Sequence, residues 1–367
     1  MKKSCLVLSV LAASSLSAMA QSSVQMYGIV DGGVRYTTNN GADKSSRLVQ
    51  VVGGGMSQSR LGINVNEDLG GGMRTLVNLE TRINSDTGAA AGNPDFWRQA
   101  WVGLQSTDFG RITIGRQYNI LFDAYTSTFA SFKYSTYIDA FKPELGMSLG
   151  SRQDNMVKYM AEWEGLRLEL QVSAGEGVTA ATTNGKTVGG LLRYATGPLA
   201  VVGAIQKLDD AAGKSVTASL LGVGYTDGPL YLNAGWAKNS IDTGFNSTLN
   251  AGLLAGISPL AAPSNPAAAG GPAAVLAKDR TMYSFGGTYQ LTTEWNLGAQ
   301  YWHAKQAGLL STMDGSADLF AFVADYAFSK RTDAYAEFDH SKIKGNLAFS
   351  NGASSRSGFM VGLRHRF

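Results

Sequence analysis

The feature that most constrains this chain is a two-residue alternation of apolar and polar side chains that returns along most of its length. After Arg60, for example, Leu61, Ile63 and Val65 fall on one face of an extended segment, and polar residues fall on the other. Such alternation is typical of β-strands with one apolar and one polar surface. No stretch after residue 20 contains 18 consecutive apolar residues, which excludes membrane-spanning helices.

The connections between these segments alternate between short and long. We predict sixteen strands, which start near residues 24, 56, 72, 96, 110, 152, 165, 187, 199, 215, 229, 280, 294, 317, 331 and 356. Seven connections are tight turns rich in glycine and polar residues. Eight are long, and they lie near residues 38–55, 85–95, 119–151, 176–186, 209–215, 240–279, 306–316 and 343–355.

An even number of strands of about ten residues, joined alternately by short turns and long loops, is typical of bacterial outer-membrane barrels. A soluble sandwich has no reason to keep every second connection short. We therefore expect an all-β fold, a 16-stranded antiparallel transmembrane β-barrel that forms a single domain over residues 21–367.

The N-terminal segment has the layout of a secretory signal peptide. Residues 1–20 begin with Lys2 and Lys3, continue with an apolar run of about 12 residues and end on Ala18-Met19-Ala20. A membrane anchor is the alternative, but this run is shorter than the ~20 residues that a spanning helix needs. We expect cleavage before Gln21, which also removes the one cysteine of the chain.

Charge and composition narrow the function classes. Charged residues make up 16% of the chain, below the roughly 25% usual for soluble domains, and 45 glycines suit a curved sheet. The net charge of +3 falls to +1 without Lys2 and Lys3, because 29 basic residues then face 28 acidic ones. This balance gives no basic field for nucleic acid, and we expect no nucleic-acid partner.

The connection at 119–151 is rich in aromatic residues, unlike a freely solvated loop. Such a segment needs a surface to pack on. Folding into the barrel provides that surface and narrows the lumen, and capping the outside of the barrel is the alternative. Since a barrel of about 16 strands encloses water, this loop is the predicted constriction.

A second long connection, 249–277, consists largely of alanine, glycine and proline. We interpret this part of the external loop at 240–279 as a tolerated insertion, and a surface-variable or adhesive loop is the other interpretation.

The sequence lacks the patterns of common catalytic and metal sites. The three histidines, His303, His340 and His365, fall on different predicted strands, and they have no ligand spacing for a metal. Neither a nucleophile elbow nor a phosphate-binding loop is present. We expect no cofactor, no metal and no enzyme activity. An outer-membrane lipase or protease and a surface adhesin remain as alternative functions.

Five motifs, in order and with fitting spacing, carry a family resemblance: SSVQMYGIVDGGVRY, SRLGINVNEDLGGG, FWRQAWVGL followed by FGRITIGRQY, PELG and the terminal GLRHRF. They resemble the trimeric general porins of Gram-negative outer membranes, of the neisserial and betaproteobacterial type. The resemblance implies a homotrimer that conducts ions and small hydrophilic solutes passively. It also implies contacts with outer-membrane lipid and lipopolysaccharide, and with the barrel-assembly machinery through the C-terminal strand that ends at Phe367.

In this family a loop folds into the pore, and basic residues on the wall face acidic residues on the loop. The resemblance assigns Arg60, Arg98 and Arg152 to the basic wall, which implies a mild preference for anions. Alternation independently turns Arg60 and Arg152 inward, together with Arg74 and Glu80, whereas Arg98 shares parity with apolar neighbours and rests on the family match alone.

The acidic side of the predicted constriction comprises Glu80 on the wall and Asp123, Asp139 and Glu144 in the loop. Leu145 stands where the family often has phenylalanine, which affects the packing of the loop tip. By parity Arg116 faces outward with apolar residues, and we expect it at a subunit interface.

Overall fold

The computed structural model describes residues 22–41, 43–89, 97–133, 135, 138–175, 186–210, 212–245, 277–308, 314–349 and 351–367. The expected signal peptide lies outside these residues, and so does the predicted loop at 249–277 except for its last residue, Ala277, which begins a strand. The strands are β1 (Ser23–Thr37), β2 (Leu48–Val52), β3 (Arg60–Gly70), β4 (Met73–Arg82), β5 (Trp97–Ser106), β6 (Gly110–Tyr118), β7 (Arg152–Trp163), β8 (Leu166–Ser173), β9 (Lys186–Thr196), β10 (Leu199–Asp209), β11 (Ser215–Asp227), β12 (Leu230–Ile241), β13 (Ala277–Gln290), β14 (Trp295–Gly308), β15 (Gly315–Ala327), β16 (Thr332–Gly345) and β17 (Ser355–Arg366). Two helices, α2 (Ile120–Thr128) and the 3-10 helix η2 (Pro143–Met147), interrupt the series.

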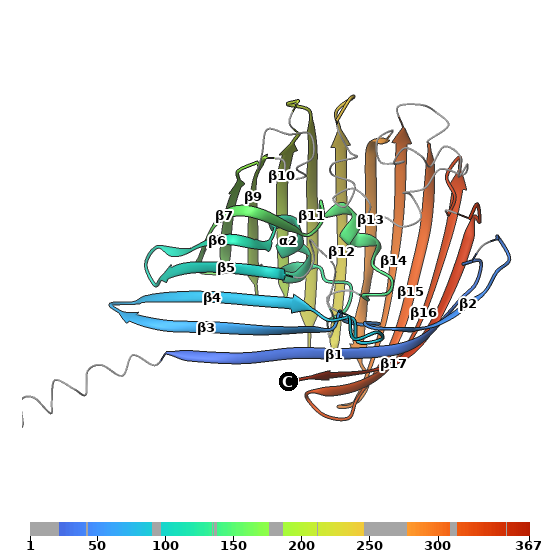
Figure 1. Ribbon diagram of the computed structural model, residues 1–367, viewed down its shortest axis with the longest axis horizontal. Coiled ribbons are helices and arrows are strands. Elements are labelled where there is room, and N and C mark those ends of the chain that lie inside the picture. Colours follow the sequence, from blue (N-terminus) through green and yellow to red (C-terminus); the bar gives the residue numbers. More distant parts are fainter. Residues whose placement is uncertain are drawn as a thin grey trace, which may run out of the picture.

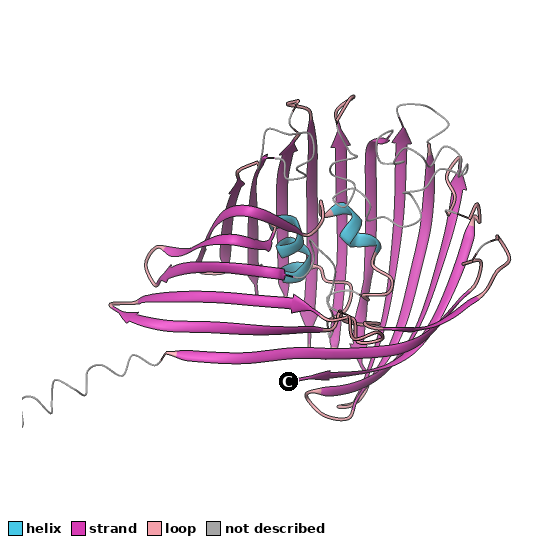
Figure 2. Ribbon diagram, in the orientation of Figure 1, coloured by secondary structure: helices cyan, strands magenta, loops and turns pink. Residues whose placement is uncertain are grey.

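The strands form one closed antiparallel barrel, in which β1 pairs with β17. On its other edge β1 pairs with two strands: its first part, Ser23–Ile29, lies beside β3, and its last part, Gly33–Thr37, lies beside β2. The 17 strands therefore fill sixteen positions, because β2 and β3 share one. Figures 1 and 2 show the strands following one another around the wall. The predicted 16-stranded barrel is confirmed, although residues 48–52 form a strand rather than part of a loop.

Short and long connections lie at opposite ends of the barrel, as alternation along an up-and-down chain requires. The short turns use residues that tolerate positive φ, such as Gly165 at +86° and Gly197 at +53°. The long connections leave the other end.

The outer and inner faces of the wall differ as the sequence pattern predicts. On β6, Ile112 and Ile114 are 49% and 55% exposed and point outward, whereas Thr113 and Gln117 are buried on the inner side. The outer face is apolar around the barrel, which suits contact with lipid. None of the described helices is long and apolar enough to cross a membrane.

The long connection after β6 folds into the barrel, which confirms the inward alternative and excludes a cap on the outside. Its helix α2 packs against the inner side of β8, β9, β10 and β11. Loop residues such as Leu121, Phe129 and Met147 form one buried apolar cluster with wall residues such as Val202 and Trp302. The aromatic content of the loop therefore serves a core that fills part of the lumen.

Candidate functional site

Asn119 connects the two ends of the constriction loop. Asn119 caps α2, because its Oδ1 accepts a hydrogen bond from the Phe122 backbone N–H at 3.0 Å. Its Nδ2 donates to the Ser148 carbonyl at 2.8 Å, and its backbone N–H donates to the Ser151 carbonyl at 3.0 Å. Asn119 thus joins the first and last turns of the loop and fixes where the loop leaves the wall.

Glycines on the inner wall let the loop lie directly on the sheet. A Cβ at Gly222 of β11 would overlap the Phe129 ring, and one at Gly235 of β12 would lie 2.5 Å from Phe129 Cε2. On β9, a Cβ at Gly189 would lie 2.6 Å from Ile120 Cδ1. We call these three glycines the docking strip; at each of them the wall lacks a side chain, and a side chain of the loop takes that place.

The middle of the loop is held by the break between β2 and β3. The Ala140 backbone N–H donates to the Gly55 carbonyl at 3.0 Å, and Ser135 Oγ donates to the Met56 carbonyl at 3.0 Å. This break is positioned in turn by Asp31 of β1, which accepts hydrogen bonds from the backbone N–H groups of Gly55 at 3.1 Å and of Ser57 at 2.6 Å. An irregular strand therefore supplies main-chain partners that a continuous ladder would use itself.

Arg98 enters the lumen through a β-bulge. Glu80 pairs with Gln99 and Thr81 pairs with Trp97, so that Arg98 is the extra residue between them. Its guanidinium is buried, and Nε donates to Glu80 Oε1 at 2.8 Å. The bulge reverses the alternation at this point, which explains why parity alone places Arg98 on the wrong face.

Two further arginines share this part of the wall with Arg98. Arg60 Nη1 lies 3.8 Å from Glu80 Oε2, and the Arg152 guanidinium lies 4.9 Å from the centre of the Tyr118 ring. The Tyr118 hydroxyl accepts hydrogen bonds from Arg98 Nη2 at 2.9 Å and from Arg152 Nη2 at 3.4 Å. The structure thus brings Arg60, Arg98 and Arg152 together around one tyrosine, with Glu80 as their acidic partner.

A cavity lies between this arginine cluster and the loop, and we call it the Arg60 cavity. Arg60 and Tyr118 line it from the wall, Arg364 and Arg366 line it from β17, and Asp123 lines it from α2. The positive wall and the loop carboxylate therefore face one another across the same space.

Asp123 is partly neutralised on the loop side. Its carboxylate forms an ion pair with Lys158 of β7, whose ammonium also donates to the Tyr118 carbonyl at 2.9 Å. Lys158 is buried and holds the first turn of α2 against the wall.

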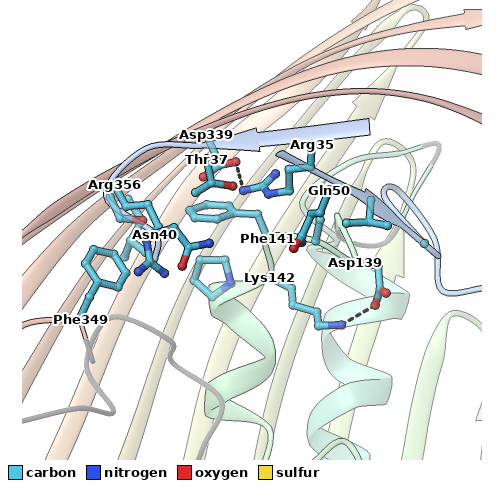
Figure 3. A pocket seen from close by; sticks show the side chains of 16 residues that line it. Arg35, Thr37, Asn40, Gln50, Asp139, Phe141, Lys142, Asp339, Phe349 and Arg356 are labelled. Carbon is cyan, nitrogen blue, oxygen red and sulfur yellow. Dashed lines mark hydrogen bonds and ion pairs between the residues drawn. The ribbon is translucent and has the colours of Figure 1, made fainter. Parts of the chain in front are cut away.

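A second cavity lies on the other side of the loop, toward the long connections, and Figure 3 shows it from close by. We call it the Arg35 cavity. Arg35 forms ion pairs with Asp339 and with Glu337, the latter at 2.8 Å. Asp139, one of the predicted loop acids, forms an ion pair with Lys142 in this cavity rather than facing the arginine cluster.

The structure corrects two assignments on the wall. Arg74 is on the predicted inner face, but it lies six residues along β4 from Glu80, or about 20 Å, and is exposed beside the short turn. Alternation predicts on which face of the sheet a side chain lies, but it does not predict the position of the residue along the barrel axis. Glu80 was assigned to the acidic side, yet it contacts Arg98 and Arg60 on the basic wall and compensates their charge.

Glu144 also differs from its predicted place. It does not face the arginines, because its carboxyl group is buried inside the folded loop, where Oε1 accepts a hydrogen bond from Ser131 Oγ at 2.8 Å. Burial raises the pKa of Glu144 to about 7, so that near neutral pH the group is only partly ionised. No local pattern indicates this burial, since an acid at a loop tip ordinarily points to water.

Several charged residues of the two cavities were missed by the sequence analysis as site residues. By alternation Arg364 and Arg366 lie on the face opposite the exposed Val361 and Leu363, but only the closure of β17 onto β1 brings them to the Arg60 cavity. Arg364 Nε donates to Asp333 Oδ1 at 3.0 Å, and its Nη1 donates to Ser57 Oγ at 2.7 Å. Residues separated by 300 positions cannot be paired by local pattern.

Arg116 and Phe367 occupy the outer side. Arg116 follows the half-exposed Ile112 and Ile114 on β6, forms an ion pair with Asp154, and donates from Nε to the Trp97 carbonyl at 2.7 Å. The Phe367 carbonyl accepts a hydrogen bond from the Gly28 backbone N–H at 3.0 Å, while its ring stays 45% exposed.

A closed antiparallel barrel with an apolar outer face, a charged inner face and an inward-folded loop defines a membrane-spanning β-barrel with a narrowed lumen. The family model for Gram-negative porins matches residues 7–346. The chain therefore belongs to the Gram-negative porin family, and it is an outer-membrane protein.

Individual relatives agree with this placement. An outer membrane porin protein of Bordetella pertussis is 32% identical over 235 residues, which cover 55% of this chain and 58% of the relative. Outer membrane porin protein 32 of Delftia acidovorans is 35% identical over 207 residues, which cover 54% of this chain and 58% of the relative. The chain thus spans less than two thirds of the length of the curated relatives that it matches.

Solved structures share the fold at lower identity. An anion-selective porin from Comamonas acidovorans has a TM-score of 0.73 at 22% identity, over 95% of this chain and 100% of that one. The trimer form of OmpT from Vibrio cholerae has a TM-score of 0.66 at 17% identity, over 94% and 99% of the two chains.

Proposed function

We propose that the chain forms a water-filled channel for the passive diffusion of ions and small hydrophilic solutes, with a mild preference for anions. The observation that carries this proposal is the arginine cluster, where Glu80 pairs with Arg60 and Arg98 while Arg98 and Arg152 both donate to the Tyr118 hydroxyl, so that three guanidinium groups are accompanied by one carboxylate. The loop acids contribute less opposing charge, because Asp123 and Asp139 each form an ion pair with a lysine. A narrow passage with an excess of positive charge favours anions.

Planar-bilayer recordings under a salt gradient test this proposal. The wild-type protein is expected to show conductance steps and a reversal potential on the anion side. Exchanging Arg60 and Arg152 for glutamate is expected to reverse the sign of the reversal potential. Each charge a few ångströms from a passing ion changes the permeation free energy of that ion by about 1 kcal/mol. Arg74→Glu is the matched control, because Arg74 is remote from the cluster, and its reversal potential is expected to stay close to wild type.

The outcomes separate two parts of the proposal. Absence of conductance steps from a folded wild-type barrel would contradict the channel itself. Conductance with an unchanged reversal potential in the double variant would remove Arg60 and Arg152 from the constriction while leaving the channel in place.

We also propose that the chain works as a homotrimer, with Arg116 near the subunit interface. A trimer form occurs among the related folds, and the Arg116–Asp154 pair is a charged group on an otherwise apolar outer face. Comparing unheated and heated samples on a gel tests the trimer. Exchanging Arg116 for methionine is expected to shift the unheated band toward the monomer.

The proposed partners at the surface follow from the outer face. Outer-membrane lipid and lipopolysaccharide contact the apolar side chains, and the barrel-assembly machinery engages the last strand with its exposed Phe367 ring. Truncation of Phe367 is expected to lower the yield of folded barrel in cells, measured by the heat-modifiable gel band, while refolding in detergent is affected less.

The alternative function as an outer-membrane lipase or protease is not supported. The family consists of channels, and the described histidines do not build a catalytic triad: His340 Nδ1 lies 2.8 Å from Ser357 Oγ, while the acid that contacts a histidine, Asp318, pairs with His303 on another strand. A hydrolase assay on detergent-solubilised protein is expected to show no turnover.

A further inference from the structure

The Arg35 cavity is large enough for a small organic solute. Its volume is about 480 Å³, which lies within the range of pockets that hold small molecules. Residues of β1, β2, β16 and β17 line it from the wall, and residues 139–143 line it from the constriction loop (Figure 3). The cavity therefore lies between a fixed wall and the loop that narrows the lumen.

The basic residues that line the cavity are Arg35, Lys142 and Arg356, and the first two have acidic partners. Arg35 forms two ion pairs with acids of β16, and Lys142 forms one with Asp139, which Figure 3 shows. Arg356 forms no ion pair within the part of the chain that the structure describes, where its hydrogen bonds go to a backbone carbonyl. Its guanidinium is therefore the cation of this cavity that an anionic solute can pair with.

Neutral groups hold Arg356 in place. Its guanidinium carbon lies 3.9 Å from the centre of the Phe349 ring, and Nε and Nη2 both donate to the Asn39 carbonyl, at 3.3 and 3.2 Å. A guanidinium has five N–H donors, and the shared carbonyl uses one on Nε and one on Nη2. The edge formed by Nη1 and Nη2 therefore keeps a pair of parallel N–H donors, which is the arrangement that binds both oxygens of a carboxylate.

Apolar side chains line the cavity as well. Phe141 and Pro143 come from the loop, and Val52 and Leu319 come from the wall. An edge contact with the Trp302 ring, with the ring centres 5.9 Å apart, fixes the Phe141 ring in turn. An inorganic anion gains nothing from these side chains, whereas a carboxylate with an aromatic body buries apolar surface against them.

The Arg60 cavity offers a different environment. Arg60, Arg364 and Arg366 all line it, and several positive charges attract small anions of any kind. The Arg35 cavity instead presents the single donor edge of Arg356 beside apolar surface. This combination favours an anion with one carboxylate and an apolar body.

We propose that the Arg35 cavity binds small aromatic monocarboxylates, with the carboxylate on the Nη1–Nη2 edge of Arg356 and the ring against Phe141 and Leu319. The proposal deepens the proposed channel function, because it names a class of solute that the lumen holds, and it rests on that function for the passage of the solute. The binding itself requires only the folded barrel.

Isothermal titration calorimetry of the full-length barrel in nonionic detergent tests the site, with benzoate as the probe. Arg356→Gln is expected to weaken benzoate binding by roughly 10- to 100-fold, because a charge-assisted contact through two hydrogen bonds is lost. Arg356→Lys keeps the charge without the paired donors and is expected to weaken binding by roughly fivefold, and it serves if the glutamine variant fails to fold. Arg74→Gln is the matched control, because Arg74 is a basic wall residue remote from the cavity, and the expected change is less than about twofold.

A second probe separates an aromatic site from a general anion site. Acetate lacks the ring and is expected to bind the wild type roughly tenfold more weakly than benzoate. Equal binding of acetate and benzoate would overturn the aromatic class of solute. Undiminished benzoate binding by folded Arg356→Gln, or a loss that appears in Arg60→Gln instead, would overturn the site.

Conductance of the wild type in a salt solution without benzoate is measured in parallel. Benzoate binding without conductance steps would contradict the channel and leave the site in place. Conductance steps without benzoate binding would contradict the site and leave the channel in place.

Discussion

The inner wall of the barrel has two halves with opposite surfaces. On β9, β11 and β12 the wall is bare where the docking strip of Gly189, Gly222 and Gly235 receives the loop. On β3 to β7 and β17 the wall carries long charged side chains, with Arg60 and Arg364 among them, and these border the Arg60 cavity. The first half contacts apolar side chains of the loop, and the second half presents charged side chains to the lumen.

The position of the loop and the electrostatic potential in the passage therefore depend on different residues. Apolar residues of the loop, such as Phe129 and Ile120, pack closely on one wall because glycines leave room for them there. The electrostatic character depends on arginines that the loop does not cover. Each half is therefore expected to respond to its own substitutions, and the responses are expected to appear in different measurements.

The largest effect is expected in the charged half. Glu80→Gln removes the acidic partner of the buried Arg98 and is expected to lower the stability of the barrel by about 3–5 kcal/mol, because an unpaired buried charge is costly. The temperature at which the folded gel band disappears measures this loss. Glu162→Gln is the control: Glu162 also pairs with an arginine, but its side chain is 57% exposed, so that the expected change is about 0–1 kcal/mol. Equal losses in the two variants would contradict the role of burial.

The next effect concerns the interior of the loop. The pKa of Glu144 is raised from 4.5 to about 7 in the docked loop, so the docked form binds a proton more tightly than the released form. The cost of the buried carboxylate is thus absent below pH 4.5 and fully present above pH 7, where it reaches about 3 kcal/mol. Docking is therefore expected to weaken as the pH rises through this window.

Glu144→Gln is expected to remove this pH dependence and to favour the docked loop above pH 7. Conductance fluctuations recorded at pH 5 and pH 8 measure it: the wild type is expected to fluctuate more at pH 8, and the variant equally at both. Stronger fluctuation of the wild type at pH 5 would contradict the sign.

A smaller loss is expected from the docking half. Gly222→Ala places a methyl group in the Phe129 ring and is expected to cost about 1–3 kcal/mol of loop docking by overpacking. Single-channel conductance is expected to rise, because a displaced loop widens the passage. Gly190→Ala on β9 is the matched control, since its Cβ would lie 3.5 Å from Leu170 Cδ2 in ordinary contact, and its conductance is expected to match the wild type.

The smallest effect is expected where the two halves meet. Asp123→Asn removes the loop carboxylate from the Arg60 cavity and leaves Lys158 without its ion pair. The preference for anions is expected to increase by about twofold, because the change in potential is screened by water in the lumen. The reversal potential measures the change, and a shift toward cations would contradict the placement of Asp123 at the passage.

The sequence predicts the barrel wall well because apolar and polar residues alternate along each strand and so mark its outer and inner faces. The alternation does not predict how far along the strand a residue lies from the constriction. Arg74 is therefore on the predicted inner face but far from the arginine cluster. It fails at Arg98, where one inserted residue exchanges the faces. Only the family resemblance assigns Arg98 to the lumen wall, and the bulge at this position is what turns its side chain inward.

The interior of the loop was beyond sequence reasoning for a different reason. Whether an acid such as Glu144 meets water or a serine depends on how the loop folds against itself and the wall. Those contacts join distant segments, as Arg364 and Ser57 also show. Local sequence patterns therefore do not predict these contacts.

The break between β2 and β3 also implies an order of events during assembly. It holds the loop only while Asp31 holds it, and Asp31 accepts a hydrogen bond from the Tyr335 hydroxyl at 2.6 Å, a contact between residues 304 positions apart. The last strands must therefore close on the first before this contact exists. All the hydrogen bonds of Asp31 that position this break are therefore present only when the ring of strands is closed.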